Sequence, residues 1–207
     1  MAESLALLAS GTGRTIANLF ACIDRGELEA EAGIVITDRP GIRSLELAEE
    51  RGVATAVVRP KDFGGPSAFS EAVFARIEAA GCSTVVLAGF LRFLPIPDRW
   101  LGRVINIHPS LLPRHGGKGC YGDRVHAAVL AEGDAETGCT VHYVDNVYDH
   151  GPAILQRRVA VAPADDVTSL ARRVFEQECL ALPEALRQHL SGAVRFQGGE
   201  AVRTSAD

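Results

Sequence analysis

Short apolar segments alternate with segments of helical spacing over the first half of the sequence, and this alternation limits the possible folds more than any other feature. The segments with the composition of strands are residues 4–9, 33–37, 54–58, 84–88 and 104–107. Between them, apolar residues recur at helical spacing from residue 16 onward, over 42–51 before Gly52, and over 66–80 before Gly81. Strands that alternate with helices form βαβ units. We therefore expect an α/β fold, doubly wound, with a mainly parallel sheet.

The pattern changes in the second half of the chain. We expect a glycine-rich loop over residues 116–122 and a helix over 123–131. Two longer strands are expected to follow, over 139–144 and 153–161. Two strands joined by a polar connection predict an antiparallel excursion at one end of the sheet. A long helix over 167–189, opened by Asp165 and Asp166, is expected to cover the structure, and residues 191–207 are expected to form a partly mobile tail.

The composition of the 207 residues excludes several classes of protein. With 47% hydrophobic and 23% charged residues, the chain is an ordinary globular protein. Its net charge of -5 argues against nucleic acid and anionic membranes as partners. The 5 cysteines are scattered and never paired as C-x-x-C, which argues against disulfides and a zinc site. Without a signal peptide or a long apolar run, we expect a cytoplasmic protein with no membrane span and no bound metal.

Two polar side chains, Asn106 and His108, interrupt the end of the apolar strand over residues 104–107. Residues i and i+2 of a strand project from the same face, so this amide and this imidazole should lie side by side. A structural histidine and a turn-capping asparagine are the simpler interpretation. The catalytic interpretation is that an amide donor beside an imidazolium stabilises an oxyanion at a carbonyl carbon. Because G-x-S-x-G is absent and Ser110 directly follows Pro109, direct transfer between two substrates fits better than a covalent intermediate.

A carboxylate that orients His108 is expected in the polar connection over residues 145–151. Asp145 and Asp149 are the candidates, because a carboxylate near an imidazole favours its charged form. A polar segment of this kind is more often simply a turn. His142, on the preceding strand, supports the site or is a hydrogen-bonded core histidine, and the core role is commoner.

The first glycine loop resembles a phosphate-binding turn without matching a nucleotide motif. Gly11 and Gly13 form G-x-G, but Ile16 occupies the third glycine position of the dinucleotide fingerprint, and no P-loop sequence is present. A strand, a small polar loop and a helix start still offer backbone N–H groups to a phosphate, with Arg14 and Thr15 as further donors. A plain tight turn is an equally good interpretation of this loop alone.

Several motifs occur in a fixed order along the chain. They read S-G-T-G from Ser10, L-A-G-F-L-R-F-L from Leu87, N-I-H-P-S-L-L-P from Asn106, G-C-T-V-H-Y-V from Gly138 and Y-D-H-G-P from Tyr148. As a set, they resemble the phosphoribosylglycinamide formyltransferase family, the folate-dependent enzymes of purine synthesis. The resemblance implies a formyltransferase fold and transfer of a formyl group from the co-substrate 10-formyltetrahydrofolate to the amine of glycinamide ribonucleotide.

Carried over residue by residue, the resemblance also implies a role for each candidate. Asn106 and His108 would hold the oxygen of a tetrahedral intermediate, Asp149 would keep the histidine charged and order water, and His142 would support them from behind. The implied contacts to the ribonucleotide phosphate and the glycinamide are Gly13, Arg14, Thr15 and Glu178. The implied folate contacts are Leu91, Arg92, Phe93, Leu94, Asn106, Asp145, Asn146, Val147, Tyr148 and Asp149.

The same resemblance implies how the chain is organised. It implies a single domain, residues 1–207, with a phosphate-binding βαβ half over 1–100, a catalytic and folate-binding half over 101–190, and a tail over 191–207. We expect a monomer or homodimer that acts on small molecules.

The chain departs from the usual pattern of this family at three places. Many members have a folate-contacting arginine where Pro66 stands, so Arg59 or Lys61 would have to compensate. The loop over residues 114–122 reads R-H-G-G-K-G-C-Y-G, where many members have an aromatic residue or a proline before a single glycine. His150 stands where a smaller residue is common. These changes bear on folate affinity more than on the chemistry.

Three other functions share parts of this pattern. An N-formyltransferase for another amine, such as a nucleotide-linked amino sugar or methionyl-tRNA, has a similar core, and so does a formyltetrahydrofolate hydrolase. We expect the additional domains of the tRNA enzyme and of the hydrolase to be absent. A non-catalytic folate- or nucleotide-binding module is the alternative from another class, and the intact Asn106, His108 and Asp149 argue against it.

Overall fold

The computed structural model describes residues 3–204, and the chain forms two compact units, of which the first ends at Ile105 and the second begins at Asn106. The first contains β1 (Glu3–Ala9), α1 (Arg14–Asp24), β2 (Ala30–Thr37), α2 (Arg43–Glu49), β3 (Ala54–Val57), η1 (Pro60–Asp62), α3 (Pro66–Ala79), β4 (Thr84–Leu87) and η2 (Asp98–Trp100). Strand β5 (Val104–His108) crosses the boundary. The second unit continues with α4 (Asp123–Glu132), β6 (Glu136–Tyr143), β7 (Ala153–Ala160), α5 (Val167–Leu190), β8 (Val194–Gln197) and β9 (Glu200–Arg203).

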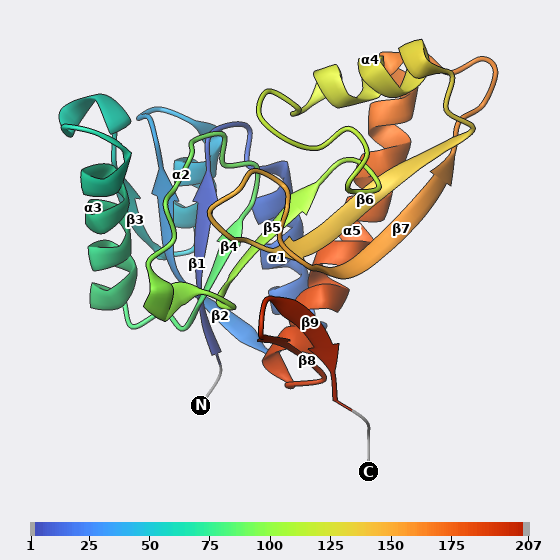
Figure 1. Ribbon diagram of the computed structural model, residues 1–207. Coiled ribbons are helices and arrows are strands. Elements are labelled where there is room, and N and C mark those ends of the chain that lie inside the picture. Colours follow the sequence, from blue (N-terminus) through green and yellow to red (C-terminus); the bar gives the residue numbers. More distant parts are fainter. Residues whose placement is uncertain (1–2, 205–207) are drawn as a thin grey trace. The chain divides into compact units, whose positions relative to one another are not determined.

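The first unit is a parallel sheet with helices on both faces. Its strands follow the order β3-β2-β1-β4, and each neighbouring pair is parallel. Strand β1 is buried from Leu5 to Ala9, as expected of a central strand that is covered on both sides. Right-handed crossovers put α1 and α2 on one face and α3 on the other. Figure 1 shows α1 and α2 behind the strands of this sheet, with α3 at the left, away from both. The predicted doubly wound fold is confirmed.

The turn between β1 and α1 needs a glycine. Gly13 precedes the helix with a φ of 74°, a left-handed conformation that glycine adopts without steric cost. A Cβ at this position would lie 3.0 Å from the Cα of Ser44 at the start of α2. The Oγ of Ser44 also donates to the carbonyl of Gly11 at 2.9 Å. Backbone conformation, close packing and this hydrogen bond therefore fix the loop against α2.

The second unit contains the predicted antiparallel excursion. Strands β6 and β7 pair antiparallel, with Glu136 opposite Ala160 at one end, and α5 runs along both strands (Figure 1). This helix begins with a capping box, because Asp166 Oδ1 accepts from the N–H of Ser169 at 2.7 Å and Ser169 Oγ accepts from the N–H of Asp166 at 3.0 Å. The buried face of β6 therefore lies against a well-defined long helix.

The expectation of a tail after residue 191 is wrong for most of that segment. Strands β8 and β9 form an antiparallel hairpin. Val194 is buried, and its carbonyl accepts a hydrogen bond from the Tyr143 hydroxyl at 3.2 Å, while the rings of Tyr143 and Phe196 lie 5.6 Å apart. Gly198 and Gly199, both at positive φ, form the turn. A Gly-Gly pair between two short segments is a typical hairpin turn, and it is the one signal in the sequence for this hairpin. The expected tail also includes residues 205–207, which lie outside the described residues.

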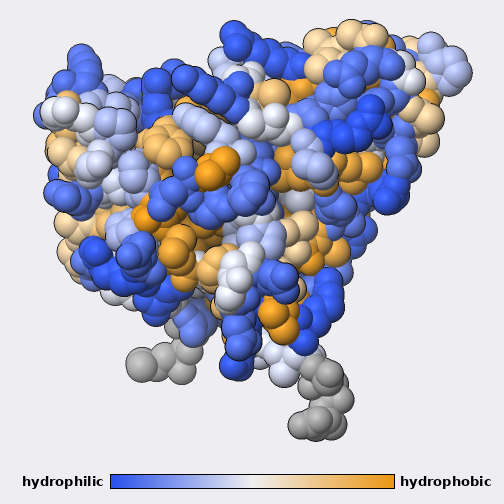
Figure 2. All heavy atoms as spheres, in the orientation of Figure 1, coloured by the Kyte–Doolittle hydropathy of each residue, from blue (hydrophilic) through white to orange (hydrophobic). Residues whose placement is uncertain are grey.

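The visible surface is largely polar. On the face drawn in Figure 2, hydrophilic residues cover most of the surface and apolar residues form small separate groups. Among the helices within residues 3–204, none has the length and apolar character needed to cross a membrane.

Candidate active site

The end of β5 brings Asn106 and His108 to the same face of the strand, as their spacing predicts. His108 is the last residue of the strand and only 4% exposed, whereas Asn106 is half-buried. The amide of Asn106 points its Nδ2 at the Nε2 of His142, at 3.1 Å. The structure therefore joins the strand-end pair to the histidine of β6.

His142 is held in one protonation state by its surroundings. Its Nδ1 lies 2.8 Å from the carbonyl of Tyr143, and a carbonyl can only accept, so Nδ1 carries the proton. Burial lowers the pKa of His142, which keeps the ring neutral near pH 7. Nε2 then has a free lone pair and accepts the hydrogen bond from Asn106.

His108 has an acceptor opposite each ring nitrogen. Its Nε2 lies 2.9 Å from the backbone carbonyl of His115, and its Nδ1 lies 3.5 Å from Oδ2 of Asp149. The first contact has the length of a good hydrogen bond, whereas the second is longer than one. The Asp149 carboxylate nevertheless faces the ring closely enough to stabilise a positive charge on it.

Asp149 belongs to the connection between β6 and β7, and its backbone is unusual. It has a φ of 51°, in the left-handed region that residues other than glycine seldom adopt. Its Oδ2 accepts from the N–H of Gly117 at 2.9 Å, and its Oδ1 lies 3.9 Å from Nε2 of His142. A strained aspartate that is held by the neighbouring loop and faces two histidines is typical of a functional position.

Together these four side chains provide an amide donor, an imidazole that can be positively charged, a neutral histidine and a carboxylate. The amide and imidazole N–H groups suit an oxygen that becomes negative, and the carboxylate stabilises the imidazolium and can accept a proton through water. This arrangement suits addition to a carbonyl carbon. It contains no serine or cysteine nucleophile.

The predicted phosphate loop lies in the first unit, at the start of α1. Gly13 is the residue before the helix, and Arg14 and Thr15 are its first residues. The first turn contains no acidic residue. The backbone N–H groups at a helix start attract anions, so this turn keeps the local features that a phosphate needs.

The predicted folate segment of the first unit follows β4. Leu91 and Phe93 are exposed and Leu94 is buried. The N–H of Leu91 donates to Ser10 Oγ at 3.0 Å, and Nε of Arg92 pairs with Oδ2 of Asp38 at 2.5 Å. The segment therefore presents apolar side chains while one of its basic residues is held by a buried carboxylate.

The predicted folate segment of the second unit is the connection that contains Asp149. Asp145 shapes it, because one carboxylate oxygen accepts from the N–H of Val147 at 2.8 Å and the other pairs with Nδ1 of His150 at 2.7 Å. Asn146, Val147 and Tyr148 are exposed. The departure at His150 thus contributes a hydrogen bond to this segment.

Two other predicted positions can be located within their own units. Glu178 lies on α5 and is half-buried. Pro66 is the first residue of α3, where proline is favourable and where it supplies no charge. Arg59, one of the two residues proposed to compensate, pairs with Asp62 at 2.7 Å.

Sequence reasoning missed two residues that contact the predicted site. His115 supplies the carbonyl opposite His108, and Asp38 holds Arg92. Asp38 directly follows the buried end of β2, which is a recognisable signal in a parallel sheet. The contact of His115 is made by its backbone, and no residue type predicts that.

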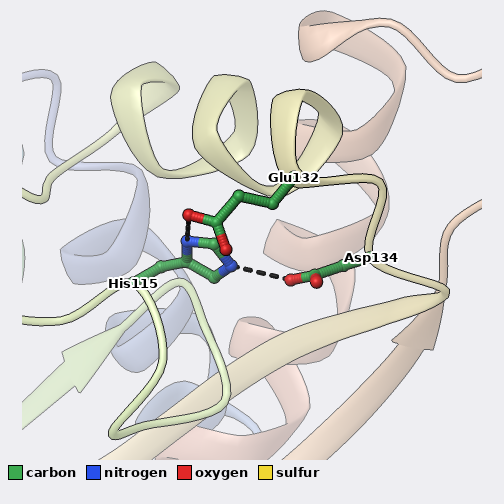
Figure 3. Close-up of side chains that lie close together, drawn as sticks. All are labelled: His115, Glu132 and Asp134. Atoms are coloured by element: carbon green, nitrogen blue, oxygen red, sulfur yellow. Dashed lines mark hydrogen bonds and ion pairs between the residues drawn. The ribbon is translucent and has the colours of Figure 1, made fainter.

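His115 also belongs to a group of possible metal ligands, although we predicted no metal. Figure 3 shows its imidazole with Nε2 toward Asp134 and Nδ1 toward Glu132, and the ligand atoms of the three residues lie within 4.8 Å of one another. Arg114 pairs with both carboxylates. The guanidinium of Arg114 already offsets one of the two carboxylate charges, which makes this group a less suitable metal site.

Comparison with known proteins gives consistent matches. The profile described as formyl transferase matches residues 3–186. The trifunctional purine biosynthetic protein adenosine-3 of Gallus gallus is 39% identical over 199 residues, which are 95% of this chain and 19% of that protein. The phosphoribosylglycinamide formyltransferase of Haemophilus influenzae is 28% identical over 94% of this chain and 91% of its own length.

A solved structure extends this likeness. Glycinamide ribonucleotide transformylase 1 from Symbiobacterium toebii aligns with a TM-score of 0.91 and 32% identity, over 99% of this chain and 95% of that one. Against the trifunctional relatives, by contrast, the chain spans only 14–19% of their length.

Proposed function

The chain belongs to the formyl transferase family, and we propose that it transfers a formyl group from 10-formyltetrahydrofolate to the amine of glycinamide ribonucleotide in purine synthesis. The observation that carries this proposal is the assembly of Asn106, His108 and Asp149 in one unit, with His108 between a carbonyl and the Asp149 carboxylate. The names of the relatives support the choice of acceptor.

In the proposed reaction, the amine of the ribonucleotide attacks the formyl carbon and the carbonyl oxygen becomes negative. Asn106 donates to this oxygen through the N–H that does not face His142, and the imidazolium of His108 stabilises it. Removing one such donor typically lowers the rate by about 10²- to 10³-fold. Nδ1 of His108 is the better candidate for this contact. It lies 3.5 Å from Oδ2 of Asp149, whereas Nε2 lies only 2.9 Å from the His115 carbonyl and is already hydrogen-bonded.

Collapse of the intermediate breaks the bond from the formyl carbon to N10 of the folate. The attacking amine loses one proton and N10 gains one, so the transfer is balanced without a further reactant. We propose that Asp149 orders the water that relays this proton and keeps His108 charged. Gly117 holds the carboxylate of Asp149 in place through its N–H at 2.9 Å.

Each unit carries part of the proposed binding residues. In the first unit, Gly13, Arg14 and Thr15 would bind the phosphate, and the segment Leu91, Arg92, Phe93 and Leu94 would contact the folate. In the second unit, Glu178 would contact the glycinamide, and Asp145, Asn146, Val147 and Tyr148 would contact the folate. Exposed backbone in such segments suits the polar edge of a pterin.

We further propose a cytoplasmic enzyme that needs no metal and acts as a monomer or homodimer. None of the five cysteines, all of which lie within residues 3–204, is in a disulfide, which suits a reducing compartment. Activity assays with a chelator and with added zinc test the prediction that no metal is needed. Activity that survives the chelator supports the prediction, and activity that requires added zinc contradicts it.

The direct test mixes the protein with both substrates and follows release of tetrahydrofolate and of formylated ribonucleotide. We expect both products in equal amounts, and both at a greatly reduced rate with His108→Ala. Turnover with a nucleotide-linked amino sugar but not with glycinamide ribonucleotide would contradict the proposed acceptor. Release of formate without any acceptor would indicate the hydrolase instead, and folate binding without turnover would indicate a binding module.

A further inference from the structure

The loop after β5 has a strained residue at its centre. His115 has a φ of 53°, in the left-handed region, and its side chain is only 6% exposed. Histidine tolerates this conformation better than most residues but still rarely adopts it. A strained backbone persists only where surrounding contacts hold it, so the contacts of His115 matter.

The side chain of His115 is tied to the end of α4. Its Nε2 lies 2.7 Å from Oδ2 of Asp134, and its Nδ1 lies 3.8 Å from Oε1 of Glu132 (Figure 3). Asp134 is itself fixed, because its N–H donates to the carbonyl of Val129 at 3.2 Å and its second oxygen pairs with Arg114. The hydrogen bond from His115 lowers the pKa of Asp134, so this carboxylate stays charged. The loop is therefore anchored to a helix end.

The backbone carbonyl of the same residue reaches the predicted catalytic histidine. The oxygen of His115 lies 2.9 Å from Nε2 of His108. Because a carbonyl only accepts, this contact requires a proton on Nε2, and the carboxylate of Asp149 at Nδ1 favours a proton on the other nitrogen. The position of the His115 carbonyl thus bears directly on the orientation of the His108 ring and on which of its nitrogens carries a proton.

We propose that His115 is a positioning residue: the contact of its imidazole with Asp134 holds its own carbonyl against His108 and so keeps the His108 ring aimed, with a proton on Nε2. The catalytic consequence rests on the proposed formyl transfer. The contact itself does not, so it can be tested separately.

A metal is the competing explanation for this cluster, and the charges argue against it. Arg114 pairs with Asp134 and also lies 3.6 Å from Oε2 of Glu132. The guanidinium offsets one of the two carboxylate charges, and Nε2 of His115 already donates to Asp134. A metal would have to displace Arg114 and break the hydrogen bond between His115 and Asp134.

Substitutions at Asp134 test the proposal without adding strain at His115. Asp134→Ala removes the acceptor, and we expect kcat to fall by about tenfold to a hundredfold while KM for both substrates stays within about twofold. Asp134→Asn keeps an acceptor oxygen and should retain kcat within about threefold. His115→Asn removes the imidazole with a residue that tolerates the left-handed region, so it should match Asp134→Ala, and the double variant should be no worse than either, because both break one contact.

Arg158→Gln is the matched control. It removes an ion pair with Glu136 that is exposed on β6 and β7, away from His108, and it should leave kcat unchanged. If Asp134→Ala is too unstable to purify, His115→Asn takes its place in every comparison.

A spectroscopic measurement tests the contact without turnover. In protein labelled with ¹⁵N-histidine, the Nε2 resonance of His108, assigned by its loss in His108→Ala, should report a protonated nitrogen near neutral pH. It should shift in Asp134→Ala and not in Arg158→Gln. An unchanged resonance together with wild-type kcat would overturn the proposal, as would a zinc requirement for activity that Asp134→Ala abolishes. If the wild type transfers no formyl group, the proposed function fails and the resonance alone decides the positioning role.

Discussion

Nδ2 of Asn106 lies 3.1 Å from Nε2 of His142, and this contact fixes the direction of the amide. His142 is kept neutral by burial, which lowers its pKa, and its Nδ1 proton is bound to the carbonyl of Tyr143. Nε2 can then only accept, so the amide nitrogen of Asn106 must face it. The second N–H of that nitrogen remains as the donor that an oxyanion would need.

Replacement of His142 tests this relationship. His142→Leu removes the acceptor, so the amide of Asn106 loses its fixed orientation, and kcat should fall by about tenfold to a hundredfold with little change in KM. His142→Gln can present a carbonyl oxygen near the position of Nε2 and should recover most of the rate. Steady-state kinetics of formyl transfer distinguish the two variants. Equal losses in both would mean that His142 serves the core and not the amide.

Removing the charged pair should affect turnover and spare binding. His108→Ala and Asp149→Asn should each lower kcat by about two to four powers of ten, because the imidazolium and its carboxylate act on the intermediate. The Kd for glycinamide ribonucleotide, measured by calorimetry, should change by less than about threefold in either variant. Weakened binding with surviving turnover would show that the roles are misassigned.

The fold was predictable because its signals are local. Strand and helix periods along residues 3–105 identify each element, and the i, i+2 spacing of Asn106 and His108 places them on one face of β5. The hairpin after α5 was overlooked because its strands are short, although the Gly-Gly turn marks it. The spacing of apolar residues and the residues typical of turns were therefore enough to predict most of the architecture.

The connections within the site were less predictable. The bond from His108 to the His115 carbonyl uses a backbone atom, and the pairing of His115 with Asp134 joins residues separated by a whole helix. Neither leaves a periodic pattern in the sequence. Such contacts depend on the path of a loop, which composition does not determine.

Asp38 should control the folate segment of the first unit. Its side chain is fully buried and pairs with Arg92 and Arg39. Burial alone would raise the pKa of Asp38, but hydrogen bonds from Arg92, Arg39 and Ser10 outweigh it and lower the pKa. Asp38→Asn removes the charge that holds Arg92, so we expect KM for the formyl donor to rise by about tenfold with kcat nearly unchanged. Steady-state kinetics with the donor varied measure this, and a change confined to kcat would contradict it.

Gly151 should tolerate no side chain. A Cβ there would lie 2.0 Å from the carbonyl oxygen of Tyr143, the atom that binds Nδ1 of His142. Gly151→Ala should therefore lower the free energy of unfolding by about 2–4 kcal/mol, because the backbone must shift. Urea unfolding followed by circular dichroism measures the loss. Gly64→Ala is the matched control, since nothing lies within 4 Å of its Cβ position and its φ is not positive.

His126 should make the protein sensitive to mild acid. It lies buried on α4, its Nδ1 has no hydrogen-bond partner among residues 3–204, and burial lowers its pKa. Below about pH 6.5 the unfolded state binds a proton that the folded state refuses, so stability falls as the pH falls, by at most about 1.4 kcal/mol per pH unit. Methionine has a volume similar to that of histidine. Between about pH 7.5 and pH 5.5, the Tm of His126→Met should therefore fall by less than the Tm of the wild type. The carboxylates with lowered pKa titrate below about pH 5.5, so they do not contribute to this change. Parallel curves of Tm against pH for the wild type and His126→Met would therefore exclude His126 as the cause of the acid sensitivity.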